Sequence, residues 1–304
     1  MAAAVGSLPP SCACKGVRSC ALCESSERVQ RLRIEEDKYA KYDVFVFDHA
    51  SGKGVRCPSL NSTSSIEEIQ SATNSCSSST QSNDIIDING LMVVHDFLTE
   101  SEEADIMEMI DGVEWVLSQS GRRKQDYGPK VNFKHKKVKT ETFVGMPEYA
   151  DMLLEKMRSV SQEKLGNYVP FEMCNLEYDE SKKSAIEMHF DDTWIWGNRL
   201  ISINLLSGSV MTLANEKTQQ GTSSCYEHLL HRYGIISHCK VVKQHFRYEW
   251  KHAILAHHIR GRRIALTMRE PSLEFQEGGE LYEKFGKKLI ALSSVRVPLR
   301  KAVS

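Results

Sequence analysis

Two hydrophobic patterns alternate along the chain. After the strand-like run Leu91–Phe97, Thr99 and Glu102 have the spacing of a helix capping box. Apolar residues then recur three or four positions apart, which predicts a helix. These residues are Ile106, Met109, Ile110 and Val113. Two further helices are expected, over Glu148–Lys164 and Glu280–Leu292.

Short strand-like segments make up most of the rest. One of them, Tyr42–Phe47, lies near the start of the chain. The others are Phe171–Tyr178, Leu200–Leu206, His252–His257 and Arg263–Arg269. Strand-rich sequence after a helical start predicts a mainly β fold, a barrel or jelly roll with flanking helices.

Residues 57–83 interrupt these patterns, because 10 Ser and 3 Thr stand among 27 residues. A segment with so little to bury is expected to be a loose or disordered linker. We therefore expect three parts. They are a Cys-rich segment with a short strand over 1–56, a Ser/Thr-rich linker over 57–88 and a main domain over 89–304.

Charge and hydropathy narrow the partners. The formal net charge is −1, so any attraction to nucleic acid must be local. No apolar run approaches the ~18 residues of a membrane-spanning helix, and we expect no membrane partner. The start, Met1–Pro10, lacks the charged region and apolar core of a secretory signal. We expect an intracellular protein, found in the cytoplasm and nucleus.

The first candidate for chemistry is His189-Phe190-Asp191. In an extended segment, residues two apart point to the same face, so the imidazole and the carboxylate can grip one ion. Two histidines and one carboxylate on one face of an octahedron are typical of non-haem Fe(II) oxygenases. His252 is the candidate third ligand, because it begins an apolar run shortly before a pair of arginines.

Other histidines compete with His252 for that role. They are His228, His231, His238, His245, His257 and His258. The arginine pair is Arg263 and Arg269, six residues apart and so on one face of a strand. Guanidinium groups match carboxylates in a planar, bidentate way. The alternative is that both arginines form ordinary salt bridges at a sheet edge.

Four cysteines crowd near the start. Cys12, Cys14, Cys20 and Cys23 have the ligand type and number of a structural Zn(II) site. Their close spacing would suit a small knuckle around one ion. The alternative is a reduced tail whose thiols bind nothing.

A basic stretch follows the first long helix. Eight Lys or Arg residues and one acid lie between Arg122 and Lys139, with Tyr127 and Phe133 among them. Such a patch can bind phosphates, and its aromatic residues can stack on a base. An acidic protein would fit it equally well, and a solvated hairpin face is the plainer interpretation. The candidate substrate residues are Arg122, Arg123, Tyr127 and Lys130.

These motifs resemble the AlkB family of oxidative demethylases. The resemblance rests on His189-x-Asp191, His252 and Arg263-x5-Arg269, and it covers about residues 12–24 and 89–295. Longer matching strings support it. They are Ser118–Asn132, Cys174–Tyr178, His189–Asp192 and Trp250–Ile254.

The resemblance implies a double-stranded β-helix with Fe(II) held by His189, Asp191 and His252. Arg263 would bind the far carboxylate of 2-oxoglutarate and Arg269 its keto-acid end. Family members remove N-methyl groups as formaldehyde, and the implied substrates are methylated lysine of actin and N6-methyladenine in DNA.

The family's cosubstrate strand corresponds to Asn175 and Tyr178. These two residues are three positions apart here, so they cannot share one face of a regular strand. The role of Asn175 is therefore in question.

One segment departs from the family pattern. Residues 226–246 are His-rich and basic where an apolar strand is expected, which puts one core strand in doubt. Two alternatives follow. One is a catalytically impaired jelly-roll scaffold that binds protein or nucleic acid through its basic 122–139 face. The other is a hydroxylase that modifies carbon and releases no formaldehyde.

Overall fold

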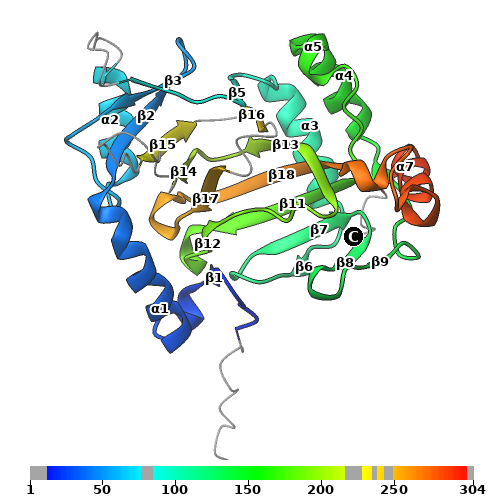
Figure 1. The fold of residues 1–304 in the computed structure, drawn as a ribbon, viewed down its shortest axis with the longest axis horizontal. Helices are drawn as coiled ribbons and strands as arrows, with labels where there is room; N and C mark the ends of the chain where they lie inside the picture. The colour runs from blue at the N-terminus through cyan, green and yellow to red at the C-terminus, as the bar shows by residue number, and fades with distance from the viewer. Residues whose placement is uncertain (1–11, 77–84, 216–227, 235–237, 243–248, 300–304) are drawn as a thin grey trace, which may run out of the picture.

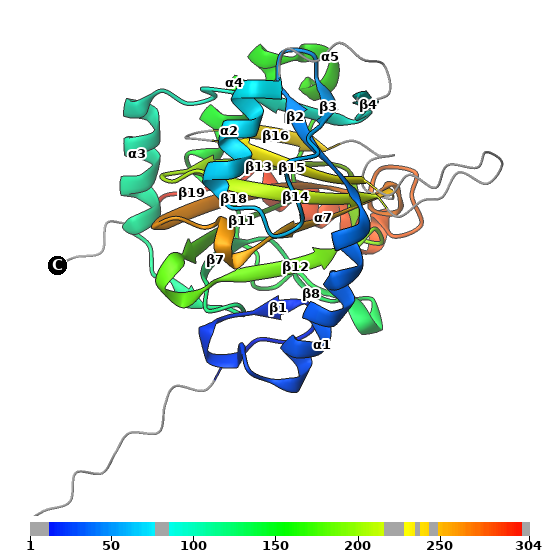
Figure 2. The same cartoon turned by 90° about the vertical axis from the view of Figure 1, so that its left-hand side faces the viewer.

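The structure is a computed structural model that describes residues 12–76, 85–215, 228–234, 238–242 and 249–299. Its frame is two facing β-sheets with helices outside them (Figures 1 and 2). The eight-stranded sheet contains, in spatial order, β1 (Arg18–Ser19), β12 (Ala185–His189), β17 (Trp250–Ile254), β14 (Ser209–Asn215), β15 (His228–Gly234), β2 (Asp43–Asp48), β3 (Lys53–Arg56) and β4 (Ile85–Asp87).

The seven-stranded sheet faces it. Its spatial order is β5 (Leu91–Val94), β16 (His238–Val242), β13 (Trp196–Leu205), β18 (Arg262–Pro271), β11 (Glu172–Asp179), β7 (Arg123–Tyr127) and β6 (Val116–Leu117). Within the two sheets all pairs are antiparallel except β2 with β15. Four short strands form two separate pairs, β8 (Lys130–Asn132) with β9 (Lys137–Lys139) and β10 (Met146–Pro147) with β19 (Arg296–Val297). Two mainly antiparallel sheets packed face to face confirm the predicted jelly roll.

Helices cover the outer faces of both sheets (Figure 1). They are α1 (Glu27–Glu36), α2 (Ile66–Cys76), α3 (Glu100–Asp111), α4 (Ala150–Val160), α5 (Gln162–Leu165) and α7 (Lys287–Ser293). The main core joins α3 and α4 to the outward side chains of β13 and β18, among them Ile106, Leu153, Ile201 and Leu266. A smaller core joins α2 to β2 and β14.

The predicted capping box begins α3. The Thr99 hydroxyl accepts from the backbone N–H of Glu102, and the Glu102 carboxylate accepts from the backbone N–H of Thr99 at 2.7 Å. The expected helix over 148–164 is present as α4 and α5, which Ser161 separates with an extended backbone. Over 280–292, one π-helical turn precedes α7.

The expected loose linker contains a helix instead. Over α2 the apolar side chains are few, yet Ile66 and Ile69 are buried against β2, which is enough to fix one helical face. Ser65 and Glu68 form a second capping box, with the Ser65 N–H donating to the Glu68 carboxylate at 2.7 Å. The strands on either side, β3 and β4, pair directly. The segment before residue 57 therefore belongs to the same sheet as the strands after residue 88.

The doubt about a core strand within 226–246 was wrong. The chain forms β15, between β14 and β2, and β16, between β13 and β5. Strand pairing on both sides favours extended backbone here, whatever the composition of the segment.

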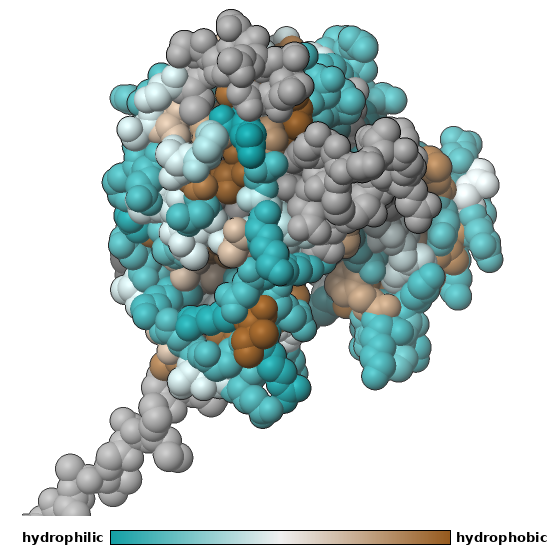
Figure 3. Space-filling view, turned by 60° about the vertical axis from the view of Figure 1, so that its left-hand side comes forward, coloured by the Kyte–Doolittle hydropathy of each residue, from teal (hydrophilic) through white to brown (hydrophobic). Residues whose placement is uncertain are grey.

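The surface is mostly polar. On the face drawn in Figure 3, hydrophobic residues lie in small separate groups among hydrophilic ones. None of the helices in the described ranges combines the length and hydropathy needed to cross a bilayer.

Candidate active site

A cavity of about 950 Å³ opens between the two sheets. Strand alternation selects the residues that line it. On β18, Arg263, Ala265, Thr267 and Arg269 line the cavity, while the side chains between them pack outward into the main core. The predicted arginine pair therefore shares one face and one cavity.

Two strands of the eight-stranded sheet hold the histidines. His189 on β12 and His252 on β17 are direct cross-strand partners, and their ring centroids lie 4.3 Å apart. Asp191 follows β12 by two residues, and its Oδ2 lies 3.8 Å from Nε2 of His252. One ligand atom from each of the three residues lies within 4.8 Å of the other two. The predicted constellation is therefore assembled at one point of the cavity wall.

The imidazole of His189 is held in one orientation. Its Nδ1 lies 2.8 Å from the backbone carbonyl of Glu187, so Nδ1–H donates there and Nε2 is left for a metal. Burial lowers the pKa of His189, against the opposing effect of Asp191. A neutral ring is the form that binds a metal ion.

The described rival histidines lie elsewhere. His258 is fully buried, with Nε2 3.0 Å from the carbonyl of Ser64, and the ring of His257 packs against it. Neither lines the cavity. The side chains of the other four rivals lie outside what the structure describes.

Arg269 lies beside the triad. Its Nη1 donates to Glu172 at 2.6 Å, and its Nη2 is 4.0 Å from Oδ1 of Asp191. The guanidinium also stacks 4.2 Å from the ring centroid of Trp196. Burial acts to lower the pKa of Arg269, but Glu172 and Asp191 outweigh it and raise the pKa. A buried, charged guanidinium therefore adjoins the candidate metal position.

Arg263 occupies the other end of the cavity wall. Its Nε donates to Oδ1 of Asn204 at 2.5 Å, and its guanidinium lies 4.8 Å from the ring centroid of Tyr178. Arg122 donates to the hydroxyl of Tyr178 at 2.8 Å from a second side. Arg18 also lines this cavity. Three arginines thus surround one phenol.

Two polar N–H groups in this wall are buried and lack a partner. They are Nη1 of Arg263 and Nε of Arg269. Leaving a buried charged donor unpaired is costly, so these groups suit the carboxylates of a small acid bound between them. The donor set of two imidazoles and one carboxylate likewise suits Fe(II) and leaves coordination positions open. The residues present therefore fit both groups.

Asn175 lies on the opposite face of β11. Its side-chain amide donates to Gln125 at 2.8 Å and to the Tyr149 hydroxyl at 2.7 Å, within the helix-covered core. The predicted difference in face between Asn175 and Tyr178 is thus observed, and only Tyr178 lines the cavity.

The four candidate substrate residues divide in the same way. Arg122 and Lys130 line the cavity, whereas Arg123 and Tyr127 do not. Arg123 pairs with Glu177 on the outer face of the sheet, and Tyr127 packs against the main core. The reason is the alternation along β7, which turns residues 123 and 127 outward and residues 124 and 126 inward.

Sequence reasoning missed three residues of this wall: Arg18, Glu172 and Asn204. Glu172 shares the inward face of β11 with Tyr178, so an alternation count from Tyr178 would have found it. Asn204 and Arg18 reach Arg263 and the cavity from strands distant in sequence. Only the sheet order reveals that placement.

Known proteins were compared with the chain. No protein-family model matches it. Over 297 residues it is 60% identical to a DNA N6-methyl adenine demethylase from Caenorhabditis elegans, covering 98% of this chain and 99% of that protein. It is 33% identical to the alpha-ketoglutarate-dependent dioxygenase alkB homolog 4 of Homo sapiens, covering 96% of this chain and 97% of that protein. A solved prolyl hydroxylase from Trichoplax adhaerens, in complex with a hypoxia inducible factor peptide fragment, covers 68% of this chain and 88% of its own at 14% identity, with a TM-score of 0.41.

The jelly roll and the convergence of two imidazoles, a carboxylate and buried arginines define a 2-oxoglutarate-dependent dioxygenase. The relatives that match nearly the whole chain make this more specific. The chain belongs to the AlkB family of dioxygenases, and its relatives indicate that it is a demethylase. Membership of this family implies Fe(II) and 2-oxoglutarate as cofactor and cosubstrate.

Proposed function

We propose that the chain is an Fe(II)- and 2-oxoglutarate-dependent N-demethylase that acts on N6-methyladenine in DNA. The observation that carries the catalytic part is the meeting of His189, Asp191 and His252 beside two buried arginines with unpartnered N–H groups. In this proposal the three residues hold Fe(II), which when bound activates dioxygen for oxidation of the methyl group.

The chain's own residues bind and orient the cosubstrate. Arg263 and the Tyr178 hydroxyl take the far carboxylate of 2-oxoglutarate, and Arg269 takes the keto-acid end next to Asp191. Arg122 and Arg18 add positive charge at the far end. In PKa terms, burial lowers the pKa of Arg263 and Tyr178 opposes this. A dianionic acid would offset the repulsion among these guanidinium groups.

The test of this chemistry uses two histidines five positions apart. His252→Ala should abolish both succinate and formaldehyde production from a methylated substrate. His257→Ala is the matched control and should retain both, because His257 lies outside the cavity. Full turnover by His252→Ala would contradict the metal assignment. Absence of turnover in the wild type would favour the scaffold, and succinate without formaldehyde would favour a carbon hydroxylase.

The substrate part rests on the β8–β9 hairpin. Five exposed lysines lie on it: Lys130, Lys134, Lys136, Lys137 and Lys139. At its tip the exposed Phe133 lies 5.1 Å from the ring of Trp196, which lines the cavity. Lysines that bind phosphate beside an aromatic pair that can stack on a base suit a nucleic acid.

The remaining basic residues of 122–139 have internal partners. Arg122 bonds Tyr178, Arg123 pairs with Glu177 and Lys124 pairs with Asp126. The basic surface therefore narrows to the hairpin at the cavity mouth. The relative from C. elegans, named for DNA N6-methyl adenine demethylation, supports the same substrate. This proposal includes a nuclear as well as a cytoplasmic location.

Charge reversal on the hairpin tests the substrate. Lys134→Glu/Lys136→Glu should weaken binding of methylated DNA and reduce its salt dependence by a slope of about 1 to 2. The matched control is Lys38→Glu/Lys41→Glu, which changes two exposed lysines near β2. Faster demethylation of a methyl-lysine actin peptide than of methylated DNA, with no effect of the hairpin change, would favour the protein substrate.

A further inference from the structure

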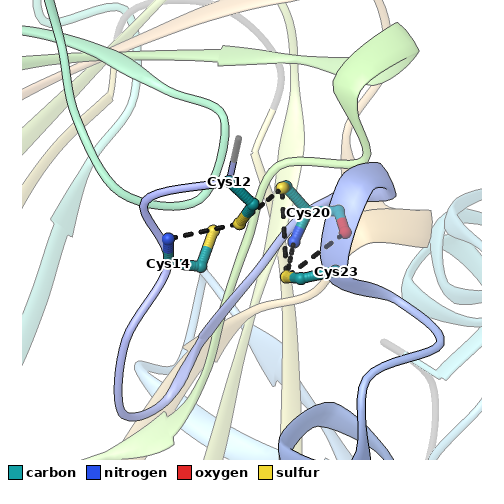
Figure 4. A group of neighbouring side chains, drawn as sticks. All are labelled: Cys12, Cys14, Cys20 and Cys23. Carbon is teal, nitrogen blue, oxygen red and sulfur yellow. Dashed lines mark hydrogen bonds between the residues drawn. The ribbon is translucent and has the colours of Figure 1, made fainter. Parts of the chain in front are cut away.

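Four cysteine thiols form a second cluster, outside the cavity (Figure 4). The Sγ atoms of Cys12, Cys14, Cys20 and Cys23 lie within 4.8 Å of one another, and all four thiols are free. Cys12 to Cys20 measures 3.5 Å and Cys20 to Cys23 measures 3.9 Å. A tetrahedral zinc site with Zn–S bonds of about 2.3 Å has an S–S edge of about 3.8 Å. The cluster already has these dimensions.

The surroundings favour thiolates. The backbone N–H of Cys14 donates to Sγ of Cys12 at 3.2 Å, and that of Cys20 donates to Sγ of Cys23 at 3.4 Å. Nη2 of Arg28 lies 3.4 Å from Sγ of Cys23, and its Nη1 donates to two backbone carbonyls. Cys20 and Cys23 are buried, packed against Val29. Donors directed at sulfur stabilise negative charge there.

The cluster also contacts the loop 118–122 at the cavity. The backbone N–H of Ser120 donates to Sγ of Cys14 at 2.9 Å, across 106 positions of sequence. Ser120 and Gly121 both have left-handed backbone, with φ of 68° and 62°. A Cβ at Gly121 would lie 3.3 Å from Cβ of Cys20, so this close approach requires glycine. Arg122 follows at once and bonds Tyr178 in the cavity.

A second connection runs through β1, which lies between Cys14 and Cys20. Ser19 donates to Glu187 at 2.6 Å on β12, the strand that carries His189. Arg18 enters the cavity and donates to Gln119 at 3.3 Å. The cysteines therefore enclose the strand that supplies one cavity arginine and hold the loop that supplies another.

We propose that Cys12, Cys14, Cys20 and Cys23 bind one Zn(II) ion, and that the occupied site positions Arg18 and Arg122 at the cosubstrate cavity. Each thiol that coordinates releases its proton to solvent. Four thiolates on a divalent ion leave two negative charges, which the Arg28 guanidinium offsets in part. Arg18 and Arg122 are positioning residues, and this second half of the proposal rests on the proposed function.

Metal content tests the site in the full-length protein. Elemental mass spectrometry should find one zinc per chain in the wild type and in His189→Ala/His252→Ala, which removes the iron site. Cys14→Ser/Cys20→Ser should lose it. Cys57→Ser is the matched control, since Cys57 is buried in the α2 core, and it should keep its zinc.

Several outcomes would overturn the zinc site. They are zinc that disappears with the histidines, zinc retained without Cys14 and Cys20, or iron in its place. If Cys14→Ser/Cys20→Ser does not fold, Co(II) exchanged into the wild type replaces that measurement. The intense visible absorption of a tetrahedral thiolate complex is then expected, and its absence counts against the site.

Calorimetry of 2-oxoglutarate binding to Mn(II)-loaded protein tests the positioning role. The zinc-free cysteine variant should bind about tenfold more weakly, the loss expected for one hydrogen bond to a charged group. Cys57→Ser should bind like the wild type. Unchanged affinity in the zinc-free variant overturns the positioning role. A wild type that does not bind 2-oxoglutarate overturns the proposed function and the positioning role together, while the zinc count stands on its own.

Discussion

Arg262 and Arg263 are chain neighbours that face opposite sides of β18. Arg262 points outward and pairs with Asp111 at 2.5 Å and with Glu177 at 2.8 Å. Arg263 points into the cavity, where Nη1 has no protein partner. The two side chains have the same chemistry, so they separate cosubstrate binding from structural ion pairing.

We predict that Arg263→Ala raises the KM for 2-oxoglutarate by roughly 10- to 100-fold, because a carboxylate loses a hydrogen bond worth about 1.5–3 kcal/mol. Arg262→Ala should leave this KM unchanged and lower the stability of the fold. Initial rates of succinate formation at varied 2-oxoglutarate measure both. An equal change in KM for the two variants would place the cosubstrate elsewhere.

At this scale the sequence indicated the candidate metal ligands, because His189 and Asp191 form a short local motif and His252 begins a strand. It did not indicate Glu172 or Asn204, since single polar residues in strands look alike until the sheet order is known. The roles of Arg123 and Tyr127 failed for a related reason. Composition marks a basic stretch, but alternation along β7 decides which of its side chains reach the cavity.

Among the elements, α1 and β12 meet through a pair of acids. Burial and the nearby carboxylate of Glu187 raise the pKa of Glu36 from 4.5 to about 8. The folded chain therefore holds this proton more tightly than the unfolded chain. As pH rises from 4.5 to about 8, the unfolded chain ionises first, and the free energy of unfolding falls.

We expect this cost to reach up to roughly 1.4 kcal/mol for each pH unit in that window. Glu36→Gln should remove it, so the variant gains stability over the wild type between pH 5 and pH 8. Urea unfolding at the two pH values measures the difference. The exposed neighbour provides the control, since Glu35→Gln should keep the wild-type pH dependence. A wild type with a flat stability profile would refute the paired-acid account.

Elements with strong local signals were predictable, as the capping box at Thr99 shows. The helix α2 was missed because its Ser and Thr content outweighed two signals, the Ser65–Glu68 box and the spacing of Ile66 and Ile69. Strands β15 and β16 were doubted for a similar reason. Their pairing depends on partners far along the chain, and local composition carries little of that information.

For the whole molecule, the cavity lies across the interface of the two sheets. The candidate iron ligands His189 and His252 are on the eight-stranded sheet, and Arg263 and Arg269 are on the seven-stranded sheet. In the proposed function, 2-oxoglutarate bound to the metal would connect the two sheets. Ligand binding should therefore stabilise the entire fold.

We predict that Mn(II) with 2-oxoglutarate at about 100 times its Kd raises the free energy of unfolding by about 2.7 kcal/mol. Removing either ligand should lower the Tm again. Differential scanning calorimetry measures the shift, with Arg263→Ala as the control that gains little from 2-oxoglutarate. A shift of the same size in Arg263→Ala would show that the acid binds at another place.

The first 56 residues reach both flanks of the eight-stranded sheet. β1 pairs with β12 at one flank, α1 runs along the side of the sheet, and β2 pairs with β15 at the other (Figure 2). Cleavage that freed this segment would uncover two rows of unpaired backbone N–H and C=O groups at once. Exposed strand edges of that kind recruit other chains. Trimming the amino-terminal segment would therefore yield an aggregating protein instead of a smaller enzyme.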